Sequence, residues 1–273
     1  MKGVLFSIGL LVLSMTILTT SFIFLQGNIE SQEEIARLSI YDRMHSEIKC
    51  IENSYSNILS MVVDVSIYDN SVSFRERLPN PNADDFKDNV DGFREFAINN
   101  SDFYLQLDMT EVKNDLPLIV EPLGIKYYHD SGFGNNRIAV INSSDIANYS
   151  LDLKIAEDGS INTVWNDVAG TDEFSINIET NTDTYSETRS LDFSASSTLE
   201  INISDATDKF INMVIGDLDI GSLEIENTDN LDLIVYTEMG VESDIPSVTF
   251  PKETINMTAV EYKISKLGKI RVM

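Results

Sequence analysis

The sequence contains few side chains that are suited to covalent catalysis. Its one cysteine is Cys50, and its two histidines are His45 and His129. A nucleophilic site would have to use His129, and neither Cys50 nor the glycine-rich segment after His129 has the spacing of a known catalytic motif. The sequence also lacks His-Glu-x-x-His, Gly-x-Ser-x-Gly, phosphate-loop and Cys-x-x-Cys motifs. We therefore expect no enzymatic activity and no cofactor.

Four carboxylates on either side of Gly221-Ser222 form a candidate metal site. They are Asp217, Asp219, Glu224 and Glu226. A hairpin bent at the glycine could bring their oxygens together as ligands for a divalent cation such as calcium. Alternation of solvent-facing residues along two strands explains the same spacing without a metal. Which interpretation holds depends on whether the turn bends the hairpin enough to bring the four carboxylates together.

The charge of the chain is strongly acidic, with 19 basic and 45 acidic residues and a formal net charge of −26. Residues 1–62 hold four basic and six acidic residues, so −24 of this charge lies on residues 63–273. Such a surface repels nucleic acid, which we exclude as a partner. An apolar content of 42% is enough for a packed core without a disulfide.

An uncharged apolar segment without proline follows the leader Met1-Lys2-Gly3. It runs from Val4 to Leu25, and 22 helical residues span about 33 Å, which matches the hydrocarbon thickness of a bilayer. Lys2 precedes the segment and several glutamates follow it, so the positive-inside rule places the N-terminus in the cytoplasm and the rest of the chain outside. We predict a single-pass transmembrane anchor over 1–27, with a lipid bilayer as partner. A cleaved signal peptide and a buried core helix are the alternatives.

Residues 28–62 have the pattern of an amphipathic helical stalk. Seven large residues step by three and four in alternation, as in the a/d seam of three heptads. The seam residues are Tyr41, Met44, Ile48, Ile51, Tyr55, Ile58 and Val62. A capping-box sequence begins at Ser31, so the helix either restarts there after a joint at Gly27 or continues from the anchor. The seam could pair with a second copy of the chain or lie along its own β domain.

These features resemble archaeal type IV pilin-like proteins with a class III signal. The matching parts are the charged leader, the apolar segment, the amphipathic continuation to Val62 and the β-rich remainder. The resemblance implies cleavage after Gly3, with Val4 as the mature start, and bundling of the apolar helices into a filament core with β domains outside. The chain departs from the pattern in its very short leader and in Ile8, where many bacterial pilins carry an acidic residue. Its stalk and head are also longer than in typical small archaeal pilins.

From Val63 onward the period of the apolar residues changes from 3.6 to 2. Alternation over 63–68 predicts a strand, and a proline-rich loop over 78–82 precedes a short helix. That helix would carry Phe86, Val90, Phe93 and Ala97 on one face. The further segments that alternate as strands do are 103–109, 149–155, 174–178, 191–195, 199–203 and 231–235. Turn signals separate them, including Glu157-Asp158-Gly159-Ser160, Ala169-Gly170-Thr171 and 227–230.

The fold class that follows is mainly β: an N-terminal transmembrane helix continues into an amphipathic helical stalk and then into an antiparallel β-sandwich head with one short helix. We divide the chain into an anchor, 1–27, a stalk, 28–62, a strand, proline-rich loop and short helix, 63–115, and a β-sandwich ectodomain, 116–273. The ectodomain could be one sandwich or two, with a boundary at 156–170.

Two further features have alternative explanations. Lys263, Lys266, Lys269 and Arg271 form a basic strip near the C-terminus. Such residues protect an exposed strand edge against aggregation, or dock on an acidic face of a neighbouring subunit or on a membrane surface. Trp165 lies between Val164 and Val168, which favours core packing over a ligand platform.

We expect a membrane-anchored extracytoplasmic structural or adhesive protein, such as a pilin-like filament subunit that contacts copies of itself through its N-terminal helix. The alternative is a monomeric, membrane-tethered binding module for a glycan, a surface protein or a divalent cation. The position of the mature N-terminus distinguishes these hypotheses.

Overall fold

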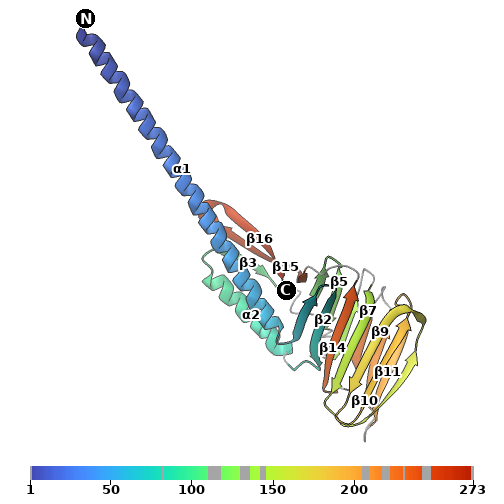
Figure 1. Ribbon diagram of the computed structural model, residues 1–273. Helices are drawn as coiled ribbons and strands as arrows, with labels where there is room; N and C mark the ends of the chain where they lie inside the picture. Colours follow the sequence, from blue (N-terminus) through green and yellow to red (C-terminus); the bar gives the residue numbers. More distant parts are fainter. Residues whose placement is uncertain are drawn as a thin grey trace.

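A long helix projects from a β-rich head in the computed structural model of the chain (Figure 1). The structure describes residues 2–81, 83–109, 118–129, 136–141, 146–204, 209–216, 222–229, 231–241 and 247–271. The N-terminus lies at the far end of the helix, and the C-terminal strand returns to the point where the helix meets the head.

Helix α1 is continuous from Lys2 to Leu59. At a rise of about 1.5 Å per residue it is about 87 Å long. Gly27 and Ser31 both lie inside it, so the joint and the new helix start that the sequence offered are not formed. A Cβ at Gly27 would meet no atom within 4 Å, so this glycine is simply a solvent-facing helical residue.

No helix in the described part of the chain combines the length and the apolar character that a membrane crossing requires. The apolar run of α1 contains Thr16, Thr19 and Thr20, and beyond Leu25 the helix continues through charged residues without a break. The predictions of a transmembrane anchor over 1–27 and of a single-pass membrane localisation are therefore wrong.

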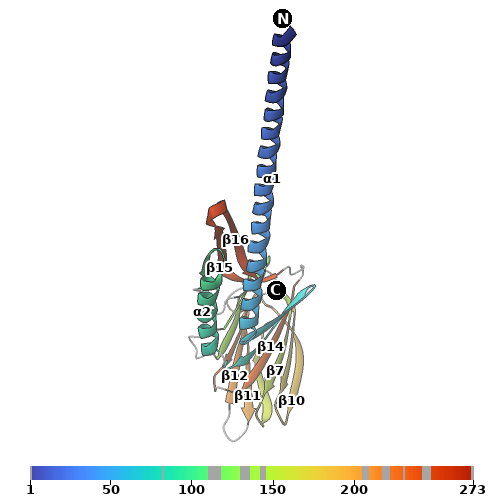
Figure 2. The ribbon, with the colours of Figure 1, turned by 90° about the vertical axis from the view of Figure 1, so that its left-hand side faces the viewer.

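The C-terminal part of α1 forms a neck with four other elements. They are α2 (Ala83–Asn100), β3 (Tyr104–Asp108), β15 (Ser247–Ala259) and β16 (Ile264–Arg271). Figure 2 shows α2 and the β15–β16 hairpin beside this part of α1. Phe86, Val90 and Ala97 are buried on α2, which confirms the predicted face of the short helix. Arg94 Nε donates to the Leu107 carbonyl oxygen at 3.0 Å and joins α2 to β3.

One sheet of the head begins directly after α1. In spatial order its strands are β1 (Val63–Tyr68), β2 (Ser71–Leu78), β14 (Leu233–Val241), β7 (Ile146–Ile155), β9 (Ala169–Glu179) and β10 (Thr184–Leu191). Among the described strands only β7 and β9 pair in parallel. We call this sheet A.

The second sheet, sheet B, extends from the neck into the head. Its order is β16, β15, β4 (Leu118–Glu121), β5 (Ile125–His129), β6 (Arg137–Ile141), β13 (Leu223–Asn227), β12 (Lys209–Ile215), β11 (Ser197–Ser204) and β8 (Ser160–Asn166), and β3 pairs with β15. Its described pairings are antiparallel. The inner faces of the two sheets share one hydrophobic core, in which Phe74 of sheet A stacks on Tyr127 of sheet B with ring centroids 4.0 Å apart.

Several strand predictions are confirmed, and some turn predictions are wrong. Strands β1, β3, β7, β9, β11 and β14 include most of the segments that alternate in the sequence. The segment 191–195 is not a strand: β10 ends at Leu191, and the Ala195 amide donates to the Asp192 carbonyl oxygen in a turn. Ala169-Gly170-Thr171 belongs to β9 instead of a turn. Residues 156–170 carry the chain from β7 in sheet A through β8 in sheet B to β9.

Replacement of a buried neck residue tests how firmly α1 is fixed to the head. Ile48 is 4% exposed and Ile35, on the same helix, is 64% exposed. We expect Ile48→Ala to lower the free energy of unfolding by about 2–5 kcal/mol, because it leaves a cavity in the core. Ile35→Ala is the matched control and should change it by less than about 0.5 kcal/mol. Urea titration of both variants measures the difference, and equal effects would contradict this packing.

Candidate functional site: the projecting helix and the neck

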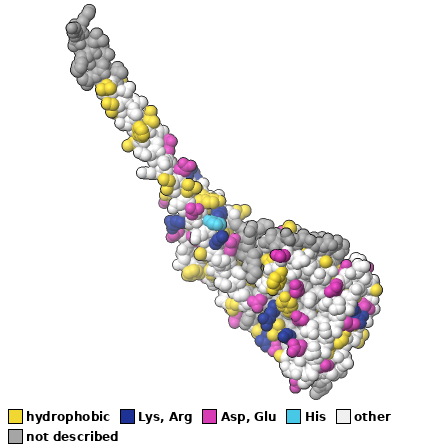
Figure 3. Space-filling model, viewed as in Figure 1, with side chains coloured by type: hydrophobic (Ala, Val, Ile, Leu, Met, Phe, Trp, Pro, Cys, Tyr) yellow, Lys and Arg dark blue, Asp and Glu magenta, His cyan; other side chains and the backbone are white. Residues whose placement is uncertain are grey.

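The part of α1 beyond the neck exposes large apolar side chains. We call residues 13–38 the projecting segment. Its eleven large apolar side chains are between 54% and 71% exposed: Leu13, Met15, Ile17, Leu18, Phe22, Ile23, Phe24, Leu25, Ile29, Ile35 and Leu38. In Figure 3 they form yellow patches along the helix between the neck and the grey N-terminal end. Apolar surface of this extent marks an interaction site in a folded protein.

The apolar side chains of the projecting segment lie on all sides of the helix. Four consecutive residues, 22–25, are Phe, Ile, Phe and Leu, and consecutive helical residues are about 100° apart. The threonine hydroxyls between them form hydrogen bonds within the helix. Thr16, Thr19 and Thr20 donate their hydroxyls to carbonyl oxygens three or four residues earlier, at 2.8, 2.8 and 2.6 Å. The part of the segment from Leu13 to Leu25 therefore offers partners a largely apolar surface, whereas residues 30–37 include Glu30, Glu33, Glu34 and Arg37.

The predicted a/d seam lies against the head of the same chain. Met44, Ile48, Ile51, Tyr55 and Val62 are buried in the shared core, and Ile58 is partly buried. Only Tyr41, at the upper end of the seam, is exposed, at 48%. The sequence allows the seam either to pair with a second copy of the chain or to lie along its own β domain. The structure has the seam along the chain's own β domain.

The basic strip also contributes to the neck. Lys266 Nζ lies 4.9 Å from the ring centroid of Tyr41 and 2.7 Å from His45 Nδ1. An ammonium group can only donate, so Nδ1 accepts this hydrogen bond. Lys266, Lys269 and Arg271 lie on the edge strand β16, as the aggregation-guard interpretation requires, whereas Lys263 precedes it, and Lys266 also binds α1.

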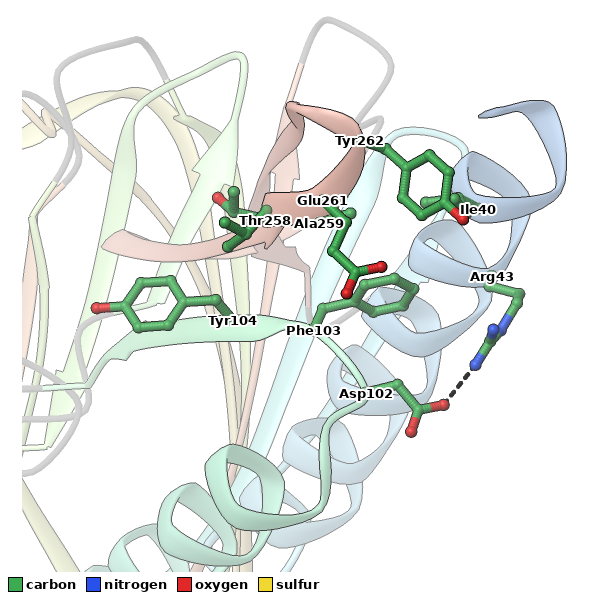
Figure 4. Close-up of a pocket in the computed structure, with 10 residues that line it drawn as sticks. Ile40, Arg43, Asp102, Phe103, Tyr104, Thr258, Ala259, Glu261 and Tyr262 are labelled. Atoms are coloured by element: carbon green, nitrogen blue, oxygen red, sulfur yellow. Dashed lines mark hydrogen bonds and ion pairs between the residues drawn. The ribbon is translucent and has the colours of Figure 1, made fainter. Parts of the chain in front are cut away.

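A hollow of about 420 Å³ lies where α1, β3 and the end of β15 meet (Figure 4). Arg43 pairs with Asp102 on its rim, and the Arg43 guanidinium lies 5.7 Å from the Phe103 ring centroid. Glu261 and Tyr262 reach it from the short 3₁₀-helix η2 (Val260–Tyr262). Arg43 and Asp102 side chains are 59% and 70% exposed, so solvent screens this pair. The hollow lies between the neck elements, and none of the described charged side chains that line it is buried away from solvent.

A buried polar cluster connects the two sheets. Tyr127 donates its hydroxyl to Glu76, and His129 Nδ1 lies 2.9 Å from Glu76 Oε2. The side chains of His129 and Glu76 are 5% and 1% exposed. Burial, and next the negative charge of Glu76, raise the pKa of Tyr127 well above its ordinary value, so its hydroxyl stays protonated. His129, the one histidine that the sequence left for catalysis, is therefore a core partner of a carboxylate.

A second polar cluster closes the open side of the sandwich, where edge strands β8 and β10 lie. Arg189 on β10 covers the Trp165 ring at 4.5 Å and binds Asp167 at 2.7 Å. Glu187 accepts hydrogen bonds from Tyr185, from Arg189 Nε at 2.9 Å and from Trp165 Nε1 at 3.0 Å. Burial would raise the pKa of Glu187, but these donors outweigh it and hold that pKa below its ordinary 4.5. Trp165 also packs edge-on against Phe174, as its apolar neighbours suggested.

The remaining predicted site residues are placed as follows. Asp217 and Asp219 lie outside the described residues. Glu224 pairs with Arg137, and Glu226 faces Asn212 and Arg137 across the strands. Within the described ranges no group of three or more potential metal ligands occurs. The backbone of Gly3 and Val4 is helical in α1.

Only one of these two polar clusters has a signal in the sequence. Glu76 alternates with Phe74 and Leu78, which places a carboxylate at a core position of a strand. Arg189 and Trp165 come from strands that are distant in sequence and belong to different sheets, so no local pattern relates them. Comparisons with protein-family models, with curated proteins and with solved structures find no match to this chain.

The pH dependence of stability should report the Glu187 cluster. A carboxyl whose pKa is lowered in the folded state stabilises it above the unfolded-state pKa, and this contribution disappears as the pH falls through the lower folded-state value. We expect Glu187→Gln to lower the free energy of unfolding by about 1–2 kcal/mol at pH 7. The difference from the wild type should vanish as the pH falls below 4.5.

The fluorescence of Trp165, the single tryptophan, follows unfolding in both proteins. Glu200→Gln is the control, because Glu200 is exposed on β11. A Glu187 variant as stable as the wild type at pH 7 would show that the cluster contributes nothing.

Proposed function

We propose that this protein is a structural subunit that assembles with copies of itself through the projecting segment of α1 and displays its β head outward. The observation that carries the proposal is the exposure of eleven large apolar side chains on a helix that extends away from the head. Burial of one such side chain contributes about 1.5–3 kcal/mol, so association would cover a surface that water solvates poorly. The N-terminal resemblance to pilin-like proteins supports the same role.

The distribution of apolar residues around α1 favours a bundle of several helices over a simple pair. A two-stranded coiled coil covers one narrow a/d seam and leaves the opposite face of each helix in water. Residues 22–25 point in four directions, so a single partner helix would leave part of them exposed. The projecting segment therefore suits the centre of a filament or of a multi-helix assembly.

The charge of the head is compatible with its position at the outside of such an assembly. Residues 63–273 carry −24 of the net −26 charges, so heads repel one another at short range. The projecting segment is uncharged from Leu13 to Ile29. Helices at the centre and heads at the periphery keep the acidic surfaces apart, while the apolar surfaces meet.

Charged substitutions in the projecting segment test the proposal. Leu18 and Phe24 are each 71% exposed, so Leu18→Asp/Phe24→Asp should leave the head folded. Burial of two unpaired carboxylates would be strongly unfavourable, so we expect the variant to remain monomeric where the wild type forms large particles. Sedimentation velocity and electron microscopy measure this difference, and circular dichroism checks the fold.

Val164→Asp is the matched control, because Val164 is an exposed apolar residue on the head, at 63%. It should assemble as the wild type does. A wild-type chain that is monodisperse and monomeric at high concentration contradicts the proposal and favours the alternative, a monomeric binding module.

We also propose that the chain is processed after Gly3, as in the pilin-like proteins that it resembles. Mass spectrometry of the protein purified from its native source should then give Val4 as the first residue. Intact Met1 would exclude this step and would remove the main support for the resemblance, although assembly through the projecting segment does not require it.

A further inference from the structure

An apolar groove lies on the neck between α1 and α2. It has a volume of about 190 Å³, and its apolar walls are Cys50 and Ile51 of α1 and Phe93, Phe96 and Ala97 of α2. Ile51 and Ala97 are buried at its floor, at 4% and 8% exposure. The two helices contact each other in the neck. We call this feature the α1–α2 groove.

The aromatic residues of the groove differ in how well the chain covers them. Phe93 packs edge-on against Tyr55, with ring centroids 4.9 Å apart, and is partly buried. Phe96 lies 6.4 Å from Phe93 and is 62% exposed. Phe96 therefore forms one open wall of an apolar hollow and does not contribute to the core. A phenylalanine in this position contributes most when a second apolar surface covers it.

The projecting segment cannot fill the groove of its own chain. Phe22 and Cys50 are separated by 28 residues of one continuous helix, which corresponds to about 42 Å. A straight helix cannot fold back on itself, so a projecting segment that occupies the groove must come from another copy. Each chain thus has an exposed apolar surface around Phe22 of α1 and an apolar groove about 42 Å further along the same helix.

We propose that the projecting segment of a second copy occupies the α1–α2 groove. This inference rests on the proposed self-assembly and specifies the surface that receives the helix. The charges fit: residues 13–29 are uncharged, and Glu47 is the one ionisable group besides Cys50 among the described residues that line the groove. A chain with a net charge of −26 can therefore bring these two surfaces together with little electrostatic repulsion.

Contact between two different surfaces has a consequence for the form of the assembly. If neighbouring helices run parallel with a stagger of about 42 Å, the projecting segment of each chain fills the groove of the next chain. Its own groove then remains open for a further copy. Such a heterologous contact repeats without closing and produces a filament. The stagger also separates neighbouring acidic heads along the filament. We therefore assign the parallel, staggered arrangement.

The single native cysteine makes the proposal directly testable. Cys50 lines the groove and is the one cysteine of the chain. We would introduce a second cysteine at each of positions 22–25 in turn, in the full chain, so that all sides of the projecting segment are sampled. Disulfides form when the two Cα atoms are within about 4.4–6.8 Å, so mild oxidation of the assembled protein reports proximity.

We expect one or more of these four variants to form a disulfide between the new cysteine and Cys50 of another copy, identified by mass spectrometry of the linked peptides. Because each chain then carries a donor and an acceptor, non-reducing electrophoresis should show a ladder of dimers, trimers and larger species. Cys50→Ser in the same background should abolish the ladder. Val164→Cys, on the head, should not link to Cys50.

Two results would overturn the inference. Links between the introduced cysteines alone, without Cys50, would show that the projecting segments contact each other and leave the groove empty. Covalent dimers without larger species would show a closed antiparallel pair and would overturn the parallel, staggered arrangement. In either case assembly in electron micrographs would still support the proposed function, whereas absence of any particles would contradict both proposals.

A substitution in the groove provides an independent readout. Phe96→Asp should raise the concentration at which the protein assembles by at least about tenfold, as expected for loss of an interfacial aromatic residue. Tyr68→Asp is the control, because Tyr68 on β1 is similarly exposed, at 57%. Both variants should retain the wild-type circular dichroism. Equal assembly of Phe96→Asp and the wild type would exclude the groove as the receiving surface.

Discussion

The packing of one face of α1 against the head is the interaction on which the rest of the molecule depends. Met44, Ile48, Ile51, Tyr55 and Leu59 insert into the same core that the two sheets share, and α2 and the β15–β16 hairpin cover the helix from the side. This packing fixes the direction in which α1 leaves the head. It also orients the N-terminal part of the helix away from the sandwich, where none of the other described residues covers it. An isolated helix of this kind gains little stability in water from propensity alone, which is why we propose that a partner covers the apolar residues of the projecting segment.

The two halves of α1 therefore have different physical roles, although they are one helix. From Ile40 to the C-terminal end of α1 the apolar residues form a single buried stripe, as in any amphipathic helix of a globular protein. On the N-terminal side of Ile40 the apolar residues lie on all sides of the helix, and the threonine hydroxyls donate hydrogen bonds to backbone carbonyl oxygens of the helix. The acidic charge is concentrated on the other side of this division, over the sandwich. The proposed assembly, with helices inside and heads outside, would satisfy both the apolar and the electrostatic requirements, and in our proposal the α1–α2 groove receives the incoming helix.

The parts of this architecture that follow local patterns could be predicted from the sequence, and those that depend on distant contacts could not. Alternation identified strands such as β7 and β11, and the spacing of Phe86, Val90 and Ala97 identified the inner face of α2. The apolar run at the N-terminus was identified as well, but its interpretation as a membrane anchor is wrong for the described residues. Alternation also failed at Phe193, which is buried in a turn. Sheet order, the parallel β7–β9 pair and the partners within the Glu76–Tyr127–His129 cluster depend on residues far apart in the chain, so one sequence does not reveal them, although its alternation marks Glu76 as a core position.

Hydrogen exchange along α1, measured as a function of protein concentration, distinguishes a projecting segment that self-assembles from one that stays exposed. In a monomer the amides of residues 13–38 belong to a solvent-exposed helix and should exchange rapidly, whereas those of β14, a central strand of sheet A, should be protected at every concentration. Self-assembly through the projecting segment predicts that exchange over 13–38 slows as the concentration rises, with no change in β14. Exchange rates over 13–38 that stay the same from dilute to concentrated protein would contradict the account.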